Sequence, residues 1–303
     1  MPNKILVAGL TNIEVTLQVE SFPIHYSPVL YPFFGVNSAV SGVGFNIAKA
    51  LTRLGNSVNF LSMVGRDSAQ LLVKKALAEA NIRSRFVLDG MEQTPHSVVM
   101  YDRAGHRQIN VDLKDIQDRA YPQVLAEQAL QDTSIAVLCN VNFTRPFLDA
   151  ALRMGKIIAT DVHAVSNIED DYNRDYMAAA HILFMSHEQL PCSPEDWARW
   201  LMDRYGTEII VIGLGVDGAL LAVRNHHYME RIPAVFTRPV INTIGAGDAL
   251  VAAFIDNYNR TRDPYQAIRK AMVFASYKVG ATSAADGFLS RPELDQWCLK
   301  LAV

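Results

Sequence analysis

Residues 242–248 read NTIGAGD and are followed at once by the largely apolar run ALVAAFIDNY. Gly245, Ala246 and Gly247 have no side chain that could shield their backbone N–H groups. The first turn of a helix leaves such groups without intrahelical partners, and the helix dipole adds partial positive charge there. This arrangement suits an anion, most often a phosphate. Asp248 would repel that anion, so its position indicates an acid that performs chemistry beside the phosphate.

The same residues have a plainer explanation, in which Asp248 simply favours the dipole of a glycine-rich helix start. The coincidence of small residues, an acid and an apolar helix favours the phosphate site. Two other glycine segments are less specific alone. SGVGFN (41–46) is a common type of tight connection before a helix. GLGVDGA (213–219) would let a backbone approach a flat or anionic ligand, but a plain hairpin explains its glycines equally well.

Bulk composition narrows the class of protein. The 303 residues are 50% hydrophobic and 19% charged, with a formal net charge of −3, which argues against sequence-independent binding to nucleic acid. Cys139, Cys192 and Cys298 form neither a disulfide framework nor a zinc signature, and they fit a reducing cytoplasm. KILVAGL (4–10) is too short for a signal peptide, and no run approaches the roughly 20 apolar residues of a spanning helix. We expect a cytoplasmic protein without a membrane segment.

Short apolar runs alternate with helical patterns along the chain. Near-continuous Ile, Val and Leu are typical of parallel strands that are covered on both faces. The expected strands are 4–9, 58–65, 134–141, 156–162, 181–186 and 208–215. Amphipathic patterns predict helices over 46–55 and 68–81. Strands that alternate with helices indicate a three-layer α/β/α sandwich whose ligands bind at the carboxyl ends of the strands.

Two stretches interrupt this alternation. Residues 11–36 are rich in β-branched residues, proline and aromatics, and SVVMYDRAGHRQINV (97–111) has a hairpin signal at Arg103-Ala104-Gly105. We interpret residues 1–303 as one domain whose inserted segments, about 11–36 and 94–112, build a small β-sheet lid over the strand ends. A lid serves a reaction that must exclude water. The alternative is an unrelated pair of surface hairpins.

Two common nucleotide motifs are missing. The chain has no GxxxxGK[ST] loop, and Gly9 after the first expected strand is not followed by GxGxxG. An NAD-dependent oxidoreductase is therefore compatible with the fold class but has no motif to support it.

Four segments taken in order resemble one family. GLTNIEV (9–15), SGVGFNIAKALTRLG (41–55), GLGVDGA (213–219) and NTIGAGDALVAAF (242–254) are similar to the ribokinase or PfkB family of carbohydrate and nucleoside kinases, over essentially the whole chain. The resemblance implies a Rossmann-like, mostly parallel sheet with a small β-sheet lid. It also implies ATP-dependent phosphorylation of a hydroxymethyl group of a sugar or nucleoside, and a homodimer formed through the lid.

The resemblance assigns roles to individual residues. Asp248 falls on the catalytic base, and Gly245, Ala246 and Gly247 fall on the anion hole for the transferring phosphoryl group. On the acceptor side fall Asn12, Glu14, Gly42, Val43 and Asn46, with Asn140 as a further contact. On the ATP side fall Ser186, Glu188, Gly213, Gly215 and Gly218. The alternatives are an exposed charge for Glu14 and a simple helix-start residue for Asn46.

The chain departs from the family pattern at several positions. Asn242 stands where the family usually has an Asp that helps to hold a monovalent cation, which argues against activation by K⁺. Ser186 and Gln189 replace the Asn and Glu of the element that organises magnesium and phosphates, with Glu188 one residue away. Mg²⁺ is still expected because ATP carries it. Val43 replaces the Lys typical of ribokinase itself.

These departures indicate one branch of the family. VINTIGAGDA (240–249), GVGFNIAKALTRLG (42–55) and QINVDLKDI (108–116) look most similar to pseudouridine kinases. The acceptor would then be a ribosyl group that bears a base, and YPFF (31–34) would either contact the base or pack within the lid. A ribokinase-like sugar kinase and a nucleotide- or sugar-binding sensor without turnover are the alternatives.

Overall fold

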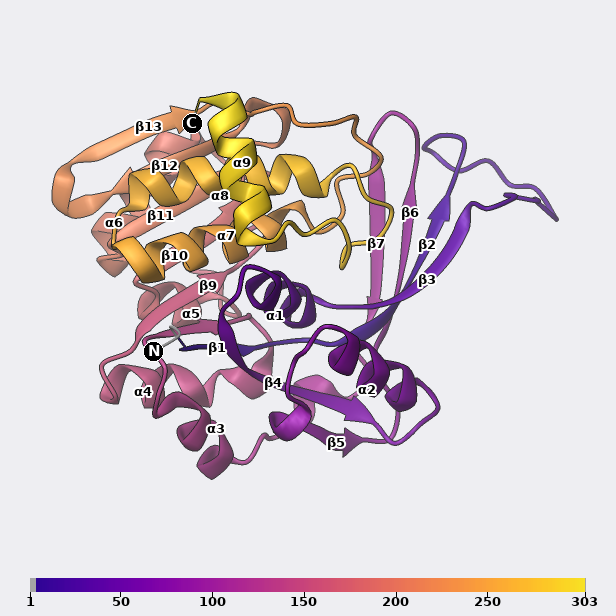
Figure 1. The fold of residues 1–303 in the computed structure, drawn as a ribbon, viewed down its shortest axis with the longest axis horizontal. Helices are drawn as coiled ribbons and strands as arrows, with labels where there is room; N and C mark the ends of the chain where they lie inside the picture. The colour runs from indigo at the N-terminus through magenta and orange to yellow at the C-terminus, as the bar shows by residue number, and fades with distance from the viewer. Residues whose placement is uncertain (1–3, 303) are drawn as a thin grey trace.

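The computed structural model describes residues 4–302, and its centre is a nine-stranded sheet (Figure 1). The strand order is β13-β12-β11-β10-β9-β8-β1-β4-β5, and all pairs are parallel except those of β12 with β11 and β13. The strands are Lys4–Ala8 (β1), Ser57–Gly65 (β4), Val87–Met91 (β5), Ile135–Leu138 (β8), Ile157–Asp161 (β9), Ile182–Ser186 (β10), Ile209–Gly213 (β11), Ala219–Val223 (β12) and Tyr228–Ile232 (β13).

Helices cover both faces of this sheet, as the apolar strands require. Successive residues of a strand point to opposite faces, so Ile5 and Val7 enter one buried cluster while Leu6 and Ala8 enter the other. The first cluster is covered by Val43–Arg53 (α1), Ala69–Glu79 (α2), Ala246–Thr261 (α7), Pro264–Lys278 (α8) and Arg291–Leu301 (α9). The second is covered by Gln123–Leu130 (α3), Pro146–Arg153 (α4), Arg174–Ala179 (α5) and Pro194–Tyr205 (α6). The predicted three-layer sandwich is confirmed.

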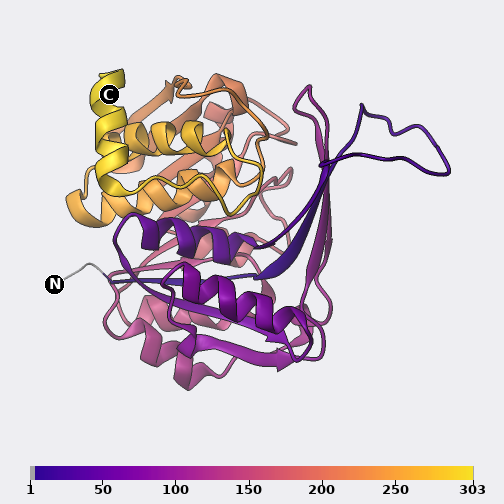
Figure 2. The same cartoon turned by 45° about the vertical axis from the view of Figure 1, so that its right-hand side comes forward.

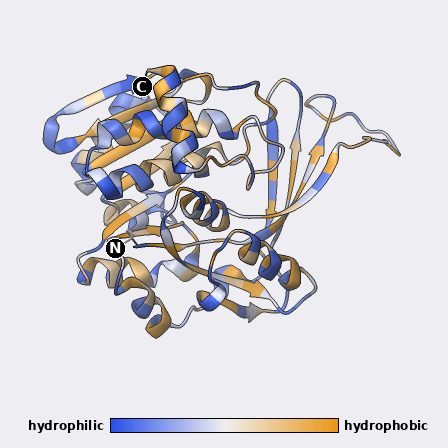
Figure 3. Ribbon diagram, in the orientation of Figure 1, coloured by the Kyte–Doolittle hydropathy of each residue, from blue (hydrophilic) through white to orange (hydrophobic). Residues whose placement is uncertain are grey.

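The six strands expected from the sequence all form, with small differences at their ends. The segments expected at 134–141 and 208–215 stop early, because the chain turns into short 3-10 helices at Asn142–Thr144 and Gly215–Asp217. The GLGVDGA segment lies in the antiparallel hairpin of β11 and β12. Hydrophobic residues fill the strands of the main sheet, and hydrophilic residues are frequent on the outer helices (Figure 3).

The two inserted stretches pair with each other in a second, four-stranded sheet, called the small sheet here. Its strands are Asn12–Gln18 (β2), Val36–Ser41 (β3), His96–Tyr101 (β6) and Arg107–Asp112 (β7), in the order β3-β2-β6-β7. Parallel pairing of β2 with β6 joins the two insertions. The small sheet stands at one side of the main body, and the chain between β2 and β3 extends beyond it (Figures 1 and 2).

The order in which strands are added to the main sheet reverses at β1. From β1 the chain passes to β4 and β5 on one side, and it later returns to β8, β9 and β10 on the other. In an open parallel sheet, ligands bind outside the carboxyl ends of the strands at such a switch point. β2 starts at Asn12, shortly after β1 ends at Ala8, so the small sheet rises from that edge.

Within residues 4–302, no helix has the length and apolar character that crossing a membrane requires.

The start of α1 depends on close contact between two backbones. A Cβ atom on Gly44 would lie 2.5 Å from the carbonyl carbon of Gly9, which follows β1. We expect Gly44→Ala to lower the free energy of unfolding by about 1–3 kcal/mol through overpacking. The check is urea unfolding beside Gly213→Ala, whose added Cβ would lie an ordinary 3.7 Å from Met185 O. Equal stability of the two variants would contradict the packing account.

Candidate active site

The GAGD loop forms the amino-terminal end of α7. Gly245 is the N-cap and has φ 74°, and a Cβ atom there would lie 2.6 Å from the carbonyl oxygen of Ala284. Only glycine adopts this conformation in so little space. The α-helical ladder begins with the bond from Ala249 N to Gly245 O at 3.0 Å, and Gly247 is exposed. The Ala246 amide donates to Thr243 O at 3.2 Å, so of the three predicted anion-hole amides those of Gly245 and Gly247 are the ones left for an anion at this helix end.

Asp248 lies in this first turn but is turned into the protein. Its relative exposure is 8%, and its Oδ2 accepts a hydrogen bond of 2.7 Å from Nδ2 of Asn46. Asn46 belongs to α1, which packs directly against α7. Helix packing thus joins two residues that are 202 positions apart in the chain.

A hydrogen-bonded chain continues from Asn46 to the small sheet. Ser41 Oγ lies 3.3 Å from Asn46 Oδ1 and donates to Glu14 Oε2 at 3.1 Å. Glu14 Oε1 accepts from Ala284 N at 3.4 Å. The exposure of Glu14 is 6%, so the alternative of an exposed charge is wrong for this residue. Three segments expected to act together, around Glu14, Asn46 and Asp248, therefore meet in one buried polar group.

Asn12 lies at the start of β2, and only the amide nitrogen of its side chain has a hydrogen-bond partner in the part of the chain that the structure describes. Its Nδ2 donates to Ser97 Oγ at 2.8 Å, while its buried Oδ1 has no hydrogen-bond partner. A buried polar atom without a partner is uncommon in a folded protein and is readily explained by a ligand that supplies a donor. Nearby, Gly42 caps α1 with φ 109°, and a Cβ atom there would lie 2.5 Å from Leu10 O, while Val43 begins the helix and is half-buried.

Burial and other acids determine the charge state of Asp248. Its pKa is raised to about 6, chiefly by burial and further by the charges of Asp161 and Glu14. The hydrogen bond from Asn46 and the charge of His163 act in the opposite direction. Asp161 is the last residue of β9, and His163 N donates to its Oδ1 at 2.8 Å. The sequence reasoning missed Asp161, although an acid at the end of a buried strand was a usable signal.

The segments expected to face ATP lie together at the ends of β10 and β11. Ser186 pairs with Gly213 across the two strands, and His187 N donates to Gly213 O at 2.9 Å. Gly215 lies in the following turn, where its Cβ position is 3.8 Å from His187 Cε1. Gly218 has a structural reason of its own, since φ 105° and close approach to Ile232 O both demand glycine in the β11–β12 hairpin.

Arg107 of the small sheet contacts both the GAGD loop and the segment after β10. Arg107 of β7 donates to Thr243 Oγ1 at 2.6 Å, directly before the GAGD loop, and its Nη2 lies 3.8 Å from Glu188 Oε1. The small sheet is thereby docked onto both the GAGD loop and the segment after β10. Sequence reasoning did not single out Arg107, because nothing local distinguishes it from a solvated strand residue.

This arrangement can be compared with known proteins. The model of the pfkB family carbohydrate kinases matches residues 2–291. The chain belongs to this family. It is a ribokinase-like kinase, a phosphotransferase that uses ATP and acts on a hydroxyl group of a sugar or nucleoside.

Three relatives are distant in sequence, but their similarity extends over nearly the whole of this kinase. It is 23% identical to the ATP-dependent ribose-1-phosphate kinase of Halopiger xanaduensis, over 96% of each chain. Among solved structures, a microbiome-derived acarbose kinase superposes with a TM-score of 0.88 at 21% identity, covering 99% of each chain. The nucleoside kinase of Burkholderia thailandensis in complex with inosine gives a TM-score of 0.80 at 18% identity, covering 98% of each chain. These structural likenesses show the shared fold.

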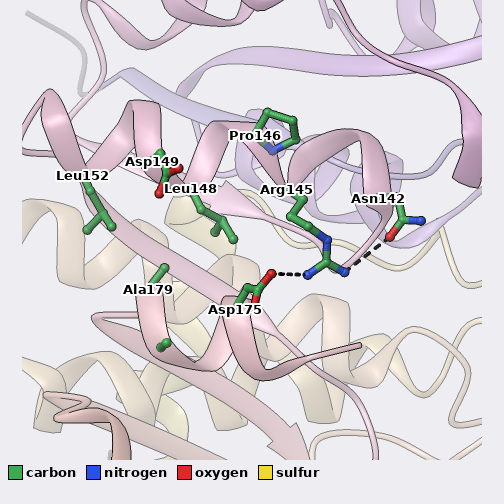
Figure 4. A pocket seen from close by; sticks show the side chains of 9 residues that line it. Asn142, Arg145, Pro146, Leu148, Asp149, Leu152, Asp175 and Ala179 are labelled. Atoms are coloured by element: carbon green, nitrogen blue, oxygen red, sulfur yellow. Dashed lines mark hydrogen bonds and ion pairs between the residues drawn. The ribbon is translucent and has the colours of Figure 1, made fainter. Parts of the chain in front are cut away.

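Asn140, the further acceptor contact predicted from the sequence, forms a hydrogen bond outside the Asn46–Asp248 pair. Its Nδ2 donates to Asn173 Oδ1 at 2.9 Å, at the start of α5, and within residues 4–302 no hydrogen bond joins it to the Asn46–Asp248 pair. A groove between α4 and α5 lies on that side of the kinase, with the ion pair of Arg145 and Asp175 in it (Figure 4). None of the predicted site residues lines this groove.

In the part of the chain that the structure describes, no three His, Cys, Asp or Glu side chains gather closely enough to hold a metal ion. Glu188, the acid nearest to the expected magnesium element, is largely exposed. These residues fit a magnesium ion that arrives bound to ATP phosphates better than one held by the protein alone.

The hydrogen bond from Asn46 lowers the pKa of Asp248, which gives a direct test of the geometry. We expect Asn46→Leu, which keeps the volume but removes the donor, to raise this pKa above about 6. The measurement is a carbon-13 NMR titration of the Asp248 carboxyl group. Ser41→Ala is the matched control, because Ser41 bonds to Asn46 and Glu14, and it should produce a smaller shift. An unchanged pKa in Asn46→Leu would contradict the hydrogen bond.

Proposed function

We propose that this kinase transfers the γ-phosphoryl group of ATP to the primary hydroxyl of a ribosyl nucleoside of the pseudouridine type. The single observation that carries the proposal is Asp248: a buried carboxylate in the first turn of α7, hydrogen-bonded to Asn46 and adjacent to the exposed Gly247 amide end of the helix. A carboxylate buried among other acids is costly, and such sites are typically functional.

The reaction needs one group to take a proton and others to stabilise spreading charge. The acceptor oxygen bonds to the γ-phosphorus as the bond to the departing ADP oxygen breaks, and the hydroxyl proton passes to Asp248. The transition state is loose, so the protein acts mainly by positioning and electrostatics. The amides of Gly245 and Gly247 would supply the anion hole, since the Ala246 amide already donates to Thr243 O at 3.2 Å. Mg²⁺ carried by ATP would neutralise phosphate charge.

The acceptor is proposed to bind between the small sheet and α1. Asn12 Oδ1 lacks a partner and would accept a hydrogen bond from a hydroxyl, and Glu14 would accept from adjacent hydroxyls. Burial raises the pKa of Glu14, while Lys278 and the Ala284 amide counteract this. Gly42 and the half-buried Val43 follow at the start of α1.

A nucleoside acceptor is supported by two features of this chain. Asn242 before the GAGD loop and the Gly-Val-Gly at the start of α1 follow the pseudouridine kinase pattern. A structural neighbour in the comparison is a nucleoside kinase that holds inosine. A sugar kinase is the second candidate, favoured by the relative named as a ribose-1-phosphate kinase.

ATP is proposed to lie over the ends of β10 and β11. Ser186 and Gly213 are neighbours there, and Gly213 and Gly215 leave the backbone open to a flat or anionic group. Glu188 would face the phosphates, in contact with Arg107. Gly218 is needed for the hairpin itself, so we assign it no direct contact with ATP.

A screen of acceptors tests the proposed substrate. We expect ATP consumption with pseudouridine, and much less with uridine, adenosine, ribose, ribose 1-phosphate and fructose. Turnover with free sugars alone would move the kinase to the second candidate. Binding of ATP without turnover of any acceptor would favour a sensor, and it would contradict the proposed reaction.

Asp248→Asn tests the proposed base. The variant keeps an acceptor oxygen for Asn46 but cannot take the hydroxyl proton, so we expect turnover to fall by at least about 10³-fold while ATP affinity and folding are retained. Asp132→Asn is a control, because Asp132 forms an ion pair with Lys4 at 3.4 Å on the surface and is not proposed to touch a substrate. Substantial turnover by Asp248→Asn would refute its role.

The raised pKa of Asp248 predicts the acid side of the pH–rate profile. The base must be ionised, so kcat/KM is expected to fall about tenfold per pH unit below about 6, rather than below the ordinary aspartate value of 3.8. ATP phosphates titrate in the same range. Asn46→Leu separates the two causes, because it should shift the acid-side fall of kcat/KM to higher pH only if the titration of Asp248 produces that fall. If the fall of kcat/KM stays at the same pH in this variant, the titration belongs to the phosphates of ATP and not to Asp248.

A homodimer through the small sheet is also proposed. β7 is an edge strand whose six residues are all exposed, including Ile109 and Val111, and exposed apolar strands at an edge favour pairing. We expect a dimer in sedimentation velocity and a monomer for the double variant Ile109→Glu/Val111→Glu. Val124→Glu on α3, a more exposed valine of the main body, should stay dimeric. A monomeric wild-type protein would contradict the dimer.

A further inference from the structure

A buried lysine lies directly behind the GAGD loop. Lys278 is the last residue of α8, and its relative exposure is 0%. Its Nζ donates a hydrogen bond of 2.8 Å to Ser283 O, and its Cε lies 3.1 Å from the Cβ position of Gly245. A lysine is almost never fully buried without a charge partner. The mechanism described above makes no use of it, so its position requires an explanation.

The charges that face Lys278 explain why the ammonium group is there. The nearby acids are Asp248, Glu14 and Asp286, and all three favour its charged form. Arg238 is the nearby cation that opposes it. Burial lowers the pKa of Lys278 to about 8, so the group still carries its charge in most molecules at pH 7. It therefore supplies one positive charge to a region that otherwise holds two buried carboxylates, Glu14 and Asp248.

The same region does not fit an exchangeable monovalent cation. The Asn242 side chain is neutral and fully engaged: its Nδ2 donates to Thr282 O at 2.8 Å, and its Oδ1 accepts from Ile244 N at 3.1 Å. Ser283 O is taken by the lysine. Two oxygen atoms near the GAGD loop, Asn242 Oδ1 and Ser283 O, thus accept hydrogen bonds from the protein, and the ammonium group itself occupies the position beside Ser283 O.

We infer that the Lys278 ammonium group serves as a tethered cation behind the anion hole, in place of a monovalent cation from solution. It offsets the charge of Glu14 and Asp248 and adds positive potential on the protein side of Gly245, where phosphoryl charge develops. Lys278 does not touch the reacting atoms in this arrangement, so it is a positioning residue. The inference rests on the proposed function for its catalytic meaning, but the exclusion of cations depends on geometry alone.

Cation binding to the wild-type protein tests the inference without any enzymatic assay. Thallium-205 NMR and calorimetry with K⁺ should detect no saturable binding site, whereas Lys278→Ala should gain one. Saturable K⁺ binding by the wild type would overturn the inference. These measurements stay decisive even if no acceptor is found, so a failure of the proposed function is recognised separately.

Turnover provides the second test. We expect the wild type to have the same kcat in KCl as in tetramethylammonium chloride. Lys278→Met should lose about 10-fold or more in kcat, less than the roughly 100-fold or greater loss typical of a direct oxyanion donor, with little change in KM for ATP. In Lys278→Ala, K⁺ or ethylammonium should restore part of kcat. A wild type that requires K⁺, or an unimpaired Lys278→Met, would overturn the inference.

Controls separate charge from packing. Lys270→Met removes another ammonium group from α8, one that pairs with Asp295 at 2.6 Å, and should leave kcat unchanged. Thermal unfolding of each variant reports whether it folds. If Lys278→Met fails to fold, two measurements still test the inference: the wild-type cation binding and the carbon-13 titration of Asp248 in Lys278→Arg. The arginine keeps the positive charge, so the pKa of Asp248 should stay near its wild-type value. A large rise of this pKa would count against the inference.

Discussion

The hydrogen bond between Asn46 Nδ2 and Asp248 Oδ2 is the contact on which the site depends. It fixes the direction of a carboxylate that would otherwise extend from the first turn of α7 toward solvent. It also ties α1 to α7, and so connects the start of the small sheet with the GAGD loop. Because this acid is buried, every neighbouring group has to be arranged around its charge.

That constraint explains features that look unrelated in the sequence. Asp161 and Glu14 add negative charge near Asp248, and together with burial they raise its pKa toward the range in which a base is useful. Lys278 adds the opposite charge from behind the loop. The glycine at 245 permits the approach of that lysine and of the 284 carbonyl. The proposed anion hole, the proposed base and the charge of Lys278 are therefore parts of one electrostatic arrangement.

Much of the fold was predictable because its signals are local. Apolar periodicity predicts six buried strands and the first two helices. The GAGD segment indicates the start of a helix that could bind an anion. The contributions of Asp161, Arg107 and Lys278 were not predictable in this way. Each is an ordinary charged residue in its local sequence, and its meaning comes from what tertiary packing places beside it. The place of Asn140 after β8 is also a local signal, whereas the bond from its Nδ2 to Asn173 comes from the packing.

By itself, the sequence determined the layers of the sandwich, the family, and the chemistry available at the mouth of α7, because periodicity and glycine spacing act over a few residues. The tertiary structure alone decided which acids share one buried region, which lysine faces them, and how the small sheet docks through Arg107. Electrostatic interactions depend on distance and burial rather than on separation along the chain. For that reason, the charge balance of this kinase could be read only after residues 14, 46, 248 and 278 had been brought together.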